Sequence, residues 1–495
     1  MSQISITGLT FCYDGSYDNI FDNLSFNIDT TWKLGFISRN GRGKTTFLKL
    51  LMGSYEYKGT ITSDVKFEYF PYEIEDKSLN TLQIIDNINT EYESWKLQKE
   101  LNLLDVDENV LYRPFGTLSN GEQTKVLLAT LFLKENGFLL IDEPTNHLDM
   151  SARDCVSSYL SQKNGFILVS HDRDFLDKCI DHVLSINKTG IDVQRGNFSS
   201  WWYNKRMQDS YEMTENEKLK RDISRLAQSA KKTAAWSEKA ENSKIGISPG
   251  RVEKSISRRS YEGEKSRKLM KQSKNIIRRK ENAIEEKTSL LQNVESSFDL
   301  KINQLPFHSN TYVFCKDLSV FYGERQIFPD ISFTIEKGDR IAVTGKNGSG
   351  KSSVIKLVCG ENINYTGTFQ KGSNIVISYV SQDTSHLNGS LTDYALSKGI
   401  DESLFKAILN KLDFSKIQFE KNIENYSEGQ KKKVLIAGSL CEKAHLHVWD
   451  EPLNFIDVIS RMQIEDLILS YNPTILFVEH DRAFCEKVAT KSVEL

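Results

Sequence analysis

The chain repeats itself once along most of its length, and this repeat limits the possible folds more than any other feature of the sequence. Short motifs recur in the same order at a nearly constant separation of 307 to 309 residues. The clearest five pairs are Tyr13 and Tyr322, Lys44 and Lys351, Ser119 and Ser427, Asp142 and Asp450, and His171 and His480. A chain of 495 residues is also too long for one ordinary domain. The repeat therefore predicts two equivalent domains, at about residues 1–200 and 309–495.

Each half alternates segments of strand and helix character. Residues 33–37 and 340–344 are apolar runs of strand length that lead into glycine-rich turns, and a helical pattern follows in residues 46–51. Such alternation is typical of a largely parallel sheet that is flanked by helices. We therefore predict an α/β fold for both halves.

Residues 201–308, between the halves, differ in composition. Residues 218–280 contain 20 Lys and Arg but only 6 Asp and Glu, whereas the whole chain has a net charge of −3. Apolar residues recur every three or four positions from Leu219 to Ala234 and every seven positions from Met270 to Phe298. This pattern predicts two antiparallel helices, and the glycines and proline of residues 241–264 predict a break between them. We expect a basic helical hairpin whose arms, of roughly 35 residues, are about 50 Å long.

Both halves contain a glycine-rich loop that is typical of phosphate binding. Residues 345–352 match the complete G-x-x-x-x-G-K-S pattern, and residues 38–45 match it except that Ser38 takes the place of the first glycine. In such loops backbone N–H groups surround the phosphates of ATP, the lysine reaches the β- and γ-phosphates, and the hydroxyl residue ligates Mg²⁺. Because the inner glycines remain, we expect the first loop to tolerate Ser38, although its full affinity stays open. The candidate nucleotide-binding residues of the loops are Asn40, Gly41, Gly43, Lys44, Thr45, Thr46, Gly345, Asn347, Gly348, Gly350, Lys351, Ser352 and Ser353.

A pair of acidic residues ends an apolar, strand-like run in each half. These pairs are Asp142 with Glu143 and Asp450 with Glu451. In enzymes that hydrolyse ATP at such loops, the aspartate holds Mg²⁺ and a further residue orients the attacking water. We therefore predict that the two glutamates are catalytic. The predicted magnesium ligands are Thr45, Asp142, Ser352 and Asp450.

Residues 119–123 and 427–430 resemble the signature sequence of ATP-binding cassette (ABC) proteins. Each stands before its Asp-Glu strand and is predicted to begin a helix. The resemblance implies that the signature of one cassette caps the ATP held by the other, with a serine, glycine amides and a helix N-terminus directed at the γ-phosphate. The implied capping residues are Ser119, Gly121, Ser427, Gly429 and Gln430.

Further positions match this family: switch histidines that contact the γ-phosphate, aromatic residues that stack on adenine, and aspartates that link the two sites. In that order they are His171 and His480, Tyr13 and Tyr322, and Asp149 and Asp457. Gln382 matches the glutamine that binds Mg²⁺ and links it to a helical subdomain. Tyr72 stands at that position in the first half, so magnesium sensing there stays open.

The arrangement of two cassettes around a helical linker resembles the ABC-F proteins, which act on ribosomes. Residues 142–149 have the form that this group typically shows, and residues 450–457 depart from it. Residues 32–35, 39–44 and 113–115 resemble the Lsa-type proteins, which protect bacterial ribosomes against lincosamides, streptogramin A and pleuromutilins. The resemblance implies a linker that docks on the 70S ribosome, on 23S rRNA near the peptidyl-transferase centre and on the P-site tRNA. The linker cations predicted to contact RNA phosphates are Lys231, Lys232, Arg251, Lys254, Arg258, Arg259, Lys265, Arg267 and Lys268.

The sequence leaves other functions open. A housekeeping ABC-F translation factor, the ATPase subunit of an ABC transporter and a DNA-repair ATPase would all share the nucleotide motifs. The basic linker has no clear use in a transporter, and the chain lacks the Cys-x-x-Cys motif expected of a zinc-hook ATPase. No apolar run reaches the roughly 18–20 residues of a membrane span, and residues 1–6 lack the features of a signal peptide. We expect a cytoplasmic monomer whose seven cysteines are reduced.

Overall fold

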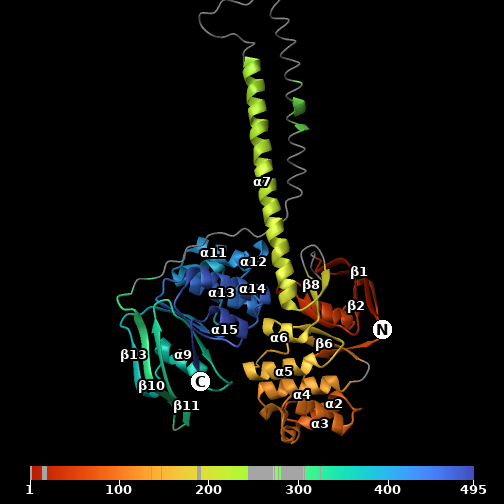
Figure 1. Cartoon of the computed structure of the whole chain (residues 1–495), viewed down its shortest axis with the longest axis vertical. Coiled ribbons are helices and arrows are strands. Elements are labelled where there is room, and N and C mark those ends of the chain that lie inside the picture. Colours follow the sequence, from red (N-terminus) through yellow and green to blue (C-terminus); the bar gives the residue numbers. More distant parts are fainter. Residues whose placement is uncertain are drawn as a thin grey trace, which may run out of the picture. The chain divides into compact units, whose positions relative to one another are not determined.

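The computed structural model of this chain describes residues 3–13, 19–134, 137–146, 148–186, 191–242, 307–323 and 325–495, together with residues 271, 274–276, 278–279 and 305. The chain forms two compact units. The first contains both halves of the repeat, Met1–Trp201 and Phe298–Leu495, and the second is Trp202–Ser297. Figure 1 labels the helices and strands.

A six-stranded sheet forms the centre of the first half, and its neighbouring strands are parallel except for the last pair. Its strand order is β5 (Lys66–Phe70), β6 (Gly137–Asp142), β7 (Phe166–Val169), β3 (Lys33–Ile37), β8 (His182–Ile186) and β9 (Ile191–Arg195). A separate antiparallel sheet consists of β2 (Phe21–Asp29), β1 (Gln3–Phe11) and β4 (Lys58–Thr62). The helices of this half are α1 (Lys44–Leu51), α2 (Thr81–Ile88), α3 (Ser94–Leu103), α4 (Asn120–Phe132), α5 (Met150–Ser161), α6 (Arg173–Cys179) and the short 3₁₀ helices Glu108–Tyr112 and Phe115–Thr117.

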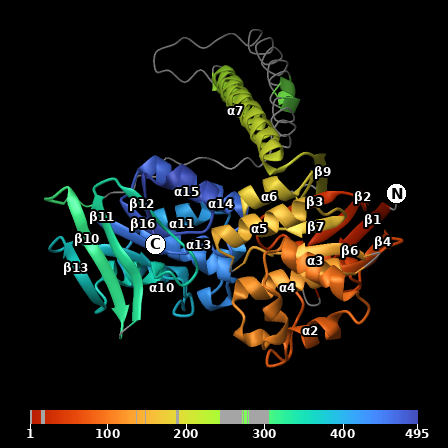
Figure 2. The same cartoon turned by 60° about the horizontal axis from the view of Figure 1, so that its bottom comes forward.

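The second half repeats this plan with a five-stranded parallel sheet. Its strand order is β14 (Ile377–Val380), β15 (Leu446–Asp450), β16 (Ile475–Val478), β12 (Arg340–Thr344) and β17 (Lys491–Glu494). An antiparallel sheet of β11 (Arg325–Glu336), β10 (Thr311–Tyr322) and β13 (Asn364–Lys371) forms the outer edge of this half in Figure 2. Its helices are α9 (Lys351–Cys359), α10 (Leu391–Lys398), α11 (Glu402–Lys411), α12 (Lys416–Phe419), α13 (Glu428–Cys441), α14 (Val458–Tyr471), α15 (Arg482–Val488) and the 3₁₀ helix Ile423–Asn425.

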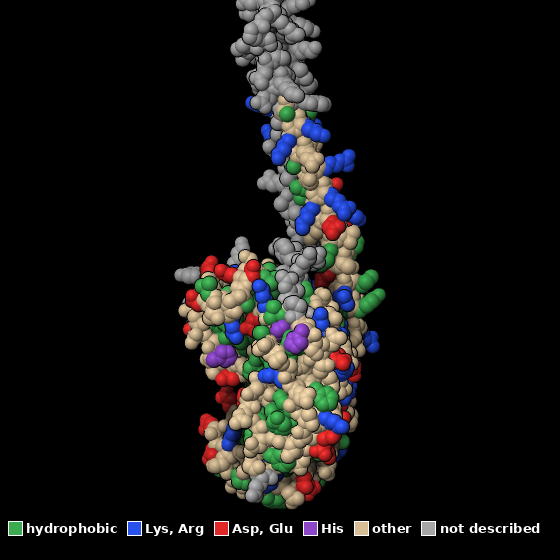
Figure 3. Space-filling view, turned by 90° about the vertical axis from the view of Figure 1, so that its left-hand side faces the viewer, with side chains coloured by type: hydrophobic (Ala, Val, Ile, Leu, Met, Phe, Trp, Pro, Cys, Tyr) green, Lys and Arg blue, Asp and Glu red, His purple; other side chains and the backbone are tan. Residues whose placement is uncertain are grey.

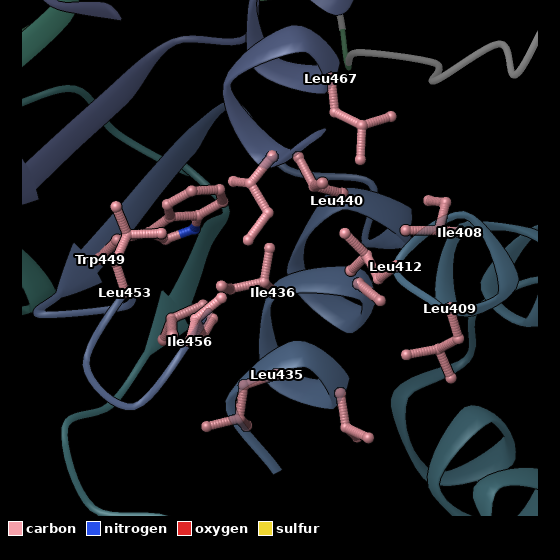
Figure 4. Close-up of a cluster of buried hydrophobic side chains, with 14 of the residues drawn as sticks. Ile408, Leu409, Leu412, Leu435, Ile436, Leu440, Trp449, Leu453, Ile456 and Leu467 are labelled. Atoms are coloured by element: carbon pink, nitrogen blue, oxygen red, sulfur yellow. The ribbon is translucent and has the colours of Figure 1, made fainter. Parts of the chain in front are cut away.

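The central strands are mostly apolar, and β7 and β16 are wholly so, because both faces of a parallel sheet are covered. Strands β7, β15 and β16 are buried at every position. Figure 4 shows the core of the second half, in which Trp449 of β15 lies near Ile436 and Leu440 of α13. This shared core fixes α13 against the strand that ends at Asp450.

The structure confirms two tandem α/β domains, and the strands predicted at residues 33–37 and 340–344 are β3 and β12. The two antiparallel sheets are additional to the predicted parallel sheets. Their strands pair segments far apart in the chain, such as Ser5 with Thr62. A local alternation of strand and helix character cannot indicate such pairing.

The second unit begins within a single long helix, α7 (Phe198–Asn242), of 45 residues. This helix confirms the helical prediction for the first arm. Residues 271, 274–276 and 278–279 are also helical. The predicted break spans residues 241–264, but α7 continues through Asn242; residues 243–264 and most of the second arm lie outside the described residues. Among the residues that are described, no helix is both long enough and apolar enough to cross a membrane.

Candidate nucleotide-binding sites

The first glycine-rich loop connects β3 to the N-terminus of α1. Gly43, the residue before α1, has a left-handed backbone (φ 86°) in which a side chain would be strained. The Lys44 ammonium donates to the backbone oxygen of Ser38 (2.9 Å) and to Oδ1 of Asn40 (3.2 Å). The lysine is thus folded over the loop, next to the amides of Gly41 and Gly43 that would surround a phosphate group.

The second loop has the same form between β12 and α9. Lys351 donates to the backbone oxygens of Gly345 (3.0 Å) and Lys346 (2.8 Å). Gly350 precedes α9 as Gly43 precedes α1. The loops differ at their first position, where Gly345 has a φ of 146° and Ser38 has no positive φ. Serine therefore fits the first loop without backbone strain.

A hydroxyl group in the first turn of α1 and of α9 donates a hydrogen bond to the aspartate that ends the catalytic strand of the same half. Thr45 Oγ1 donates to Oδ2 of Asp142 at 2.8 Å, and Ser352 forms the corresponding bond to Asp450. Oδ1 of Asp450 is buried and has no hydrogen-bond partner among the described residues. Burial raises the pKa of both aspartates. Hydroxyl and carboxylate oxygens are ligands that Mg²⁺ prefers, so both positions fit that ion.

The glutamates that follow these aspartates occupy unequal environments. Glu451 accepts hydrogen bonds from Gln382 (Nε2–Oε2, 2.9 Å) and Asn454 (Nδ2–Oε2, 2.7 Å), and His480 Nε2 lies 3.5 Å from Oε1. Burial alone would raise the pKa of Glu451, but the bond from His480 and its other polar neighbours bring that pKa below its usual value.

Glu143 is surrounded differently. His171 Nε2 lies 3.2 Å from Glu143 Oε1. Burial, followed by the charge of Asp142, raises the pKa of Glu143 to about 8. Tyr72, the counterpart of Gln382, does not bind Glu143: its hydroxyl is buried without a hydrogen-bond partner in the part of the chain that is described. The sequence departure at Tyr72 therefore changes the surroundings of the glutamate itself.

The two signature segments begin helices, as predicted. Ser119 caps α4 and accepts a bond from Glu122 N (3.2 Å), and Ser427 caps α13 and accepts one from Gln430 N (3.4 Å). Gln430 turns back, so that its Oε1 accepts the backbone N–H of Ser427 at 3.0 Å. Reciprocal bonds of this kind fix the first turn of a helix and leave its other N–H groups directed outward.

Residues from both halves meet at each loop. In the first loop, Asn40 Nδ2 donates to the backbone oxygen of Phe455 (2.6 Å) in the second half. A Cβ atom added to Gly429 would lie only 2.9 Å from the same Asn40 nitrogen. The second signature therefore lies against the first phosphate loop.

The second loop faces a cavity of about 660 Å³ that both halves line. The first half contributes Ser119, Gly121 and Asp149, and the second contributes residues of its phosphate loop with Gln382, Glu451 and His480. Together the two sites have the head-to-tail arrangement that the resemblance implied.

The two predicted adenine-binding tyrosines lie beside the loops. The hydroxyl of Tyr13 is 2.7 Å from Oγ1 of Thr46, and that of Tyr322 accepts a bond from Ser353 Oγ at 3.3 Å. Tyr13 is 42% exposed and Tyr322 is 50% exposed. Each ring is thus anchored at its hydroxyl while part of its surface stays accessible to a base.

Comparison with known proteins agrees with this geometry. The family described as ABC transporter matches residues 21–146 and 328–454, once in each half. The chain belongs to this family. Its two halves are ATP-binding cassettes, here named cassette 1 and cassette 2, and the protein is an ABC-type ATP hydrolase.

Two curated relatives resemble this two-cassette protein over most of their length. The ribosome protection protein VmlR of Bacillus subtilis (strain 168) is 26% identical over 99% of this chain and 86% of that protein. The energy-dependent translational throttle protein EttA of Escherichia coli (strain K12) is 25% identical over 95% of this chain and 88% of that protein. These relatives are ABC-F proteins, which confirms the resemblance seen in the sequence.

Solved structures show the same fold. The archaeal ribosome recycling factor aABCE1, solved in complex with the ribosomal stalk protein aP1, is similar with a TM-score of 0.63 and 18% identity, over 98% of this chain and 87% of that one. A structure described as RNase-L Inhibitor gives a TM-score of 0.62 and 18% identity, over 99% and 87% of the two chains.

Three residues near the ATP sites were missed by the sequence motifs. Tyr69 donates to Oδ2 of Asp142 at 3.1 Å. Arg153 donates to Asp172 Oδ2 (2.7 Å) in cassette 1 and to the backbone oxygen of His480 (3.0 Å) in cassette 2. The third, Lys432, is buried in α13. A tyrosine in a strand and cations on helices are common anywhere, so the sequence carries no signal that singles them out.

The linking aspartates begin the helices that follow the catalytic strands. Asp149 caps α5 and accepts the N–H of Ala152 (2.9 Å), and it also bonds the backbone of Asn347 in cassette 2. Asp457 caps α14 and pairs with Lys433 at 3.2 Å. Asp149 therefore joins the two cassettes directly, as the resemblance implied for this position.

Two of the predicted RNA contacts, Lys231 and Lys232, are exposed on α7. Figure 3 shows Lys and Arg side chains spread along the described part of this helix. The other predicted contacts lie outside the described residues: Arg251, Lys254, Arg258, Arg259, Lys265, Arg267 and Lys268.

Proposed function

We propose that this protein is a ribosome-binding ABC-F ATPase that protects the bacterial ribosome from antibiotics acting at the peptidyl-transferase centre. The observation that carries the proposal is the combination of two composite ATP sites with a long helix that leads into the basic segment of residues 218–280. Similarity to the B. subtilis ribosome protection protein over nearly the whole chain supports it. The proposed drugs are lincosamides, streptogramin A and pleuromutilins, and the proposed place of action is the cytoplasm.

In this proposal the loop residues bind ATP through backbone amides, Lys44 and Lys351. Mg²⁺, when bound, neutralises charge on the β- and γ-phosphates. Thr45 with Asp142 would hold it in one site. Ser352, Asp450 and Gln382 would hold it in the other.

The catalytic roles follow from the contacts of the acidic pairs. Glu143 and Glu451 would polarise the attacking water, and His171 and His480 would contact the γ-phosphate from beside them. Each site is complete only when the signature of the opposite cassette closes on it. ATP binding therefore holds the cassettes together, and hydrolysis removes the phosphate that joins them.

The basic linker would bind RNA phosphates through charge. Seven cations are exposed in the described part of α7: Arg206, Lys218, Lys220, Arg221, Arg225, Lys231 and Lys232. Such contacts release counterions and weaken steeply with salt. We propose that a single chain, with its cassettes paired intramolecularly, places this linker on 23S rRNA and the P-site tRNA and leaves after hydrolysis.

Binding is tested with the double variant Glu143→Gln, Glu451→Gln. It should retain two ATP per chain and co-sediment with 70S ribosomes, whereas Lys44→Ala, Lys351→Ala should do neither. If the glutamine variant bound two ATP but pelleted with membranes, the ATPase subunit of a transporter would be the better assignment. Failure to retain two nucleotides would remove the basis of the proposal.

Protection is tested by drug susceptibility of bacteria that express the protein. Wild type should raise the inhibitory concentration of a lincosamide, and Lys231→Glu, Lys232→Glu should reduce that gain. Lys421→Glu, Lys443→Glu makes the same charge change at exposed positions of cassette 2 and should keep it. Ribosome binding without any change in susceptibility would instead indicate a housekeeping translation factor.

A further inference from the structure

The helix that carries the second signature, α13, contains a lysine with two unusual contacts. Lys432 is only 1% exposed. Its ammonium donates to the backbone oxygen of Ser381 (3.0 Å), the residue before Gln382, and to the backbone oxygen of Glu451 (3.2 Å). One side chain therefore joins α13 to both segments that hold the polar groups of the second ATP site.

A buried ammonium is costly unless an opposite charge compensates it. Burial lowers the pKa of Lys432, and Glu479 is the strongest of the neighbouring charges that raise it. Glu479 is itself buried, and its carboxylate accepts the N–H groups of Leu453 (2.7 Å) and His480 (3.1 Å). The cation and the carboxylate thus hold the backbone on either side of the catalytic groups.

Cassette 1 has neutral hydroxyl residues at the three corresponding positions. Thr124 stands where cassette 2 has Lys432, Thr145 where it has Leu453, and Ser170 where it has Glu479. Thr124 Oγ1 donates to Asn120 within its own helix (2.9 Å), and Thr145 and Ser170 contact each other at 3.1 Å. The charged framework is therefore specific to cassette 2.

We propose that Lys432 is a positioning residue that ties the helix capping the first ATP site to the catalytic loop of the second. The first turn of α13 lies on the first phosphate loop through Gly429 and Asn40. Three residues further along the same helix, within one turn, Lys432 holds the carbonyl of Glu451. Nucleotide bound in the first site fixes α13 and thereby fixes Glu451, and the converse link through Thr124 is absent from the described contacts of α4.

The inference rests on the proposed role of Glu451 in hydrolysis. Single-turnover ATP hydrolysis by the full chain tests both the role of Lys432 and the role of Glu451. Lys432→Met should slow hydrolysis of the second-site ATP by between about ten-fold and about 100-fold, since misplacing a reacting group by about 1 Å costs that much. ATP binding should be unchanged. In a Glu143→Gln background only the second site is active, and there Lys432→Met should slow hydrolysis by the same factor. In a Glu451→Gln background the second site is already inactive, and Lys432→Met should slow hydrolysis no further.

Thr124→Val is the matched control in cassette 1, and it should change the single-turnover rates less than about two-fold because its bond lies within one exposed helical turn. Equal slowing by Lys432→Met in both glutamine backgrounds, or no slowing in wild type, would overturn the inference. If Glu451→Gln alone left the rates unchanged, the assigned role of Glu451 would fail independently of Lys432.

Loss of Lys432 removes one of the cations near Glu479 and leaves Arg461 to compensate it, so folding is controlled with a second variant. Lys432→Thr, Leu453→Thr, Glu479→Ser installs the residues of cassette 1 and removes both buried charges. It should melt like wild type and bind two ATP, yet hydrolyse the second-site ATP slowly. A folded triple variant with the wild-type rate would contradict the inference as clearly as the single variant.

Discussion

The two ATP sites share their motifs but differ in the contacts that close them. Cassette 2 contacts the first phosphate loop directly: Asn40 bonds Phe455, and Arg39 pairs with Asp413 at 3.2 Å. At the second site, Asp105, the counterpart of Asp413, lines the 660 Å³ cavity. The contacts that face the two loops have thus diverged even where, as at Asp105 and Asp413, the residue is the same.

The same divergence appears in the arginines that follow the switch histidines. Arg173 of cassette 1 forms a two-bond ion pair with Glu465 of cassette 2, one bond being Nη1–Oε2 at 3.2 Å, and the Glu465 side chain has no exposed surface. Arg482 of cassette 2 pairs with Asp154 of cassette 1 at 2.8 Å, but both side chains are about 40% exposed. One contact is therefore buried and its counterpart is solvated.

The largest effect is expected from breaking the buried pair. Arg173→Ala should lower the free energy of unfolding by about 3 kcal/mol, because Lys487 is then the one ion-pair partner of the buried Glu465 carboxylate among the described residues. Arg482→Ala should cost less than about 1 kcal/mol, as exposed pairs do. Urea unfolding of both variants measures the difference. Equal losses would show that burial does not distinguish the two contacts.

Acid should destabilise cassette 2 through a histidine that cassette 1 lacks. His447 of β15 is 2% exposed and stands where β6 has Leu139, and burial lowers its pKa to about 4. An unfolded histidine binds its proton near pH 6.5, so stability from the neutral imidazole is complete above that pH and is lost as the pH falls toward 4. The loss reaches up to about 3 kcal/mol.

Thermal melting at pH 7 and pH 5 tests this. The melting temperature of wild type should fall further between the two pH values than that of His447→Leu, which installs the residue of cassette 1. His447→Gln keeps a polar group that can still bond Ser439 (3.1 Å from the histidine) and should behave like the leucine variant. An identical fall in all three proteins would assign the acid sensitivity to other groups.

The local chemistry of both sites was predictable from the sequence because it depends on short motifs. The turn before α1, the caps at Ser119 and Ser427, and the aspartates at the strand ends each need residues within a few positions of one another. Contacts across the two cassettes were not predictable. Asn40 and Phe455 are 415 positions apart, and no periodic pattern relates them.

The burial of Lys432 was also not predictable from the sequence. The run of three lysines at residues 431–433 has the composition of a solvated helical face. In the fold Lys432 and Lys433 are buried, because α13 packs its whole circumference against the sheet and neighbouring helices. Burial of this kind depends on tertiary packing around the helix, which the local pattern does not contain.

The glycines of the two signature segments differ in how closely other atoms surround them. A Cβ at Gly429 would lie 2.3 Å from the backbone oxygen of Phe455, so Gly429→Ala should destabilise the protein by between about 1 and 3 kcal/mol. At Gly121 the nearest atom would be a side-chain carbon of Leu148 at 3.7 Å, an ordinary contact. Gly121→Ala should leave the melting temperature nearly unchanged. A larger loss for Gly121→Ala would contradict the difference in packing between the two sites.

The smallest effect concerns the hydroxyls beside the magnesium aspartates. Tyr69 donates to Asp142, whereas Tyr379, its counterpart, is 40% exposed and gives no hydrogen bond to Asp450 among the described contacts. One hydrogen bond contributes about 1 kcal/mol, or roughly five-fold in affinity.

Tyr69→Phe should therefore raise the Mg²⁺ concentration for half-maximal hydrolysis about five-fold in a Glu451→Gln background, where only the first site turns over. Tyr379→Phe in a Glu143→Gln background should change it less than two-fold, because no bond to the aspartate is lost. Equal shifts would mean that the ring, rather than the hydroxyl, orients each aspartate, and the two metal positions would then be alike in spite of their different neighbours.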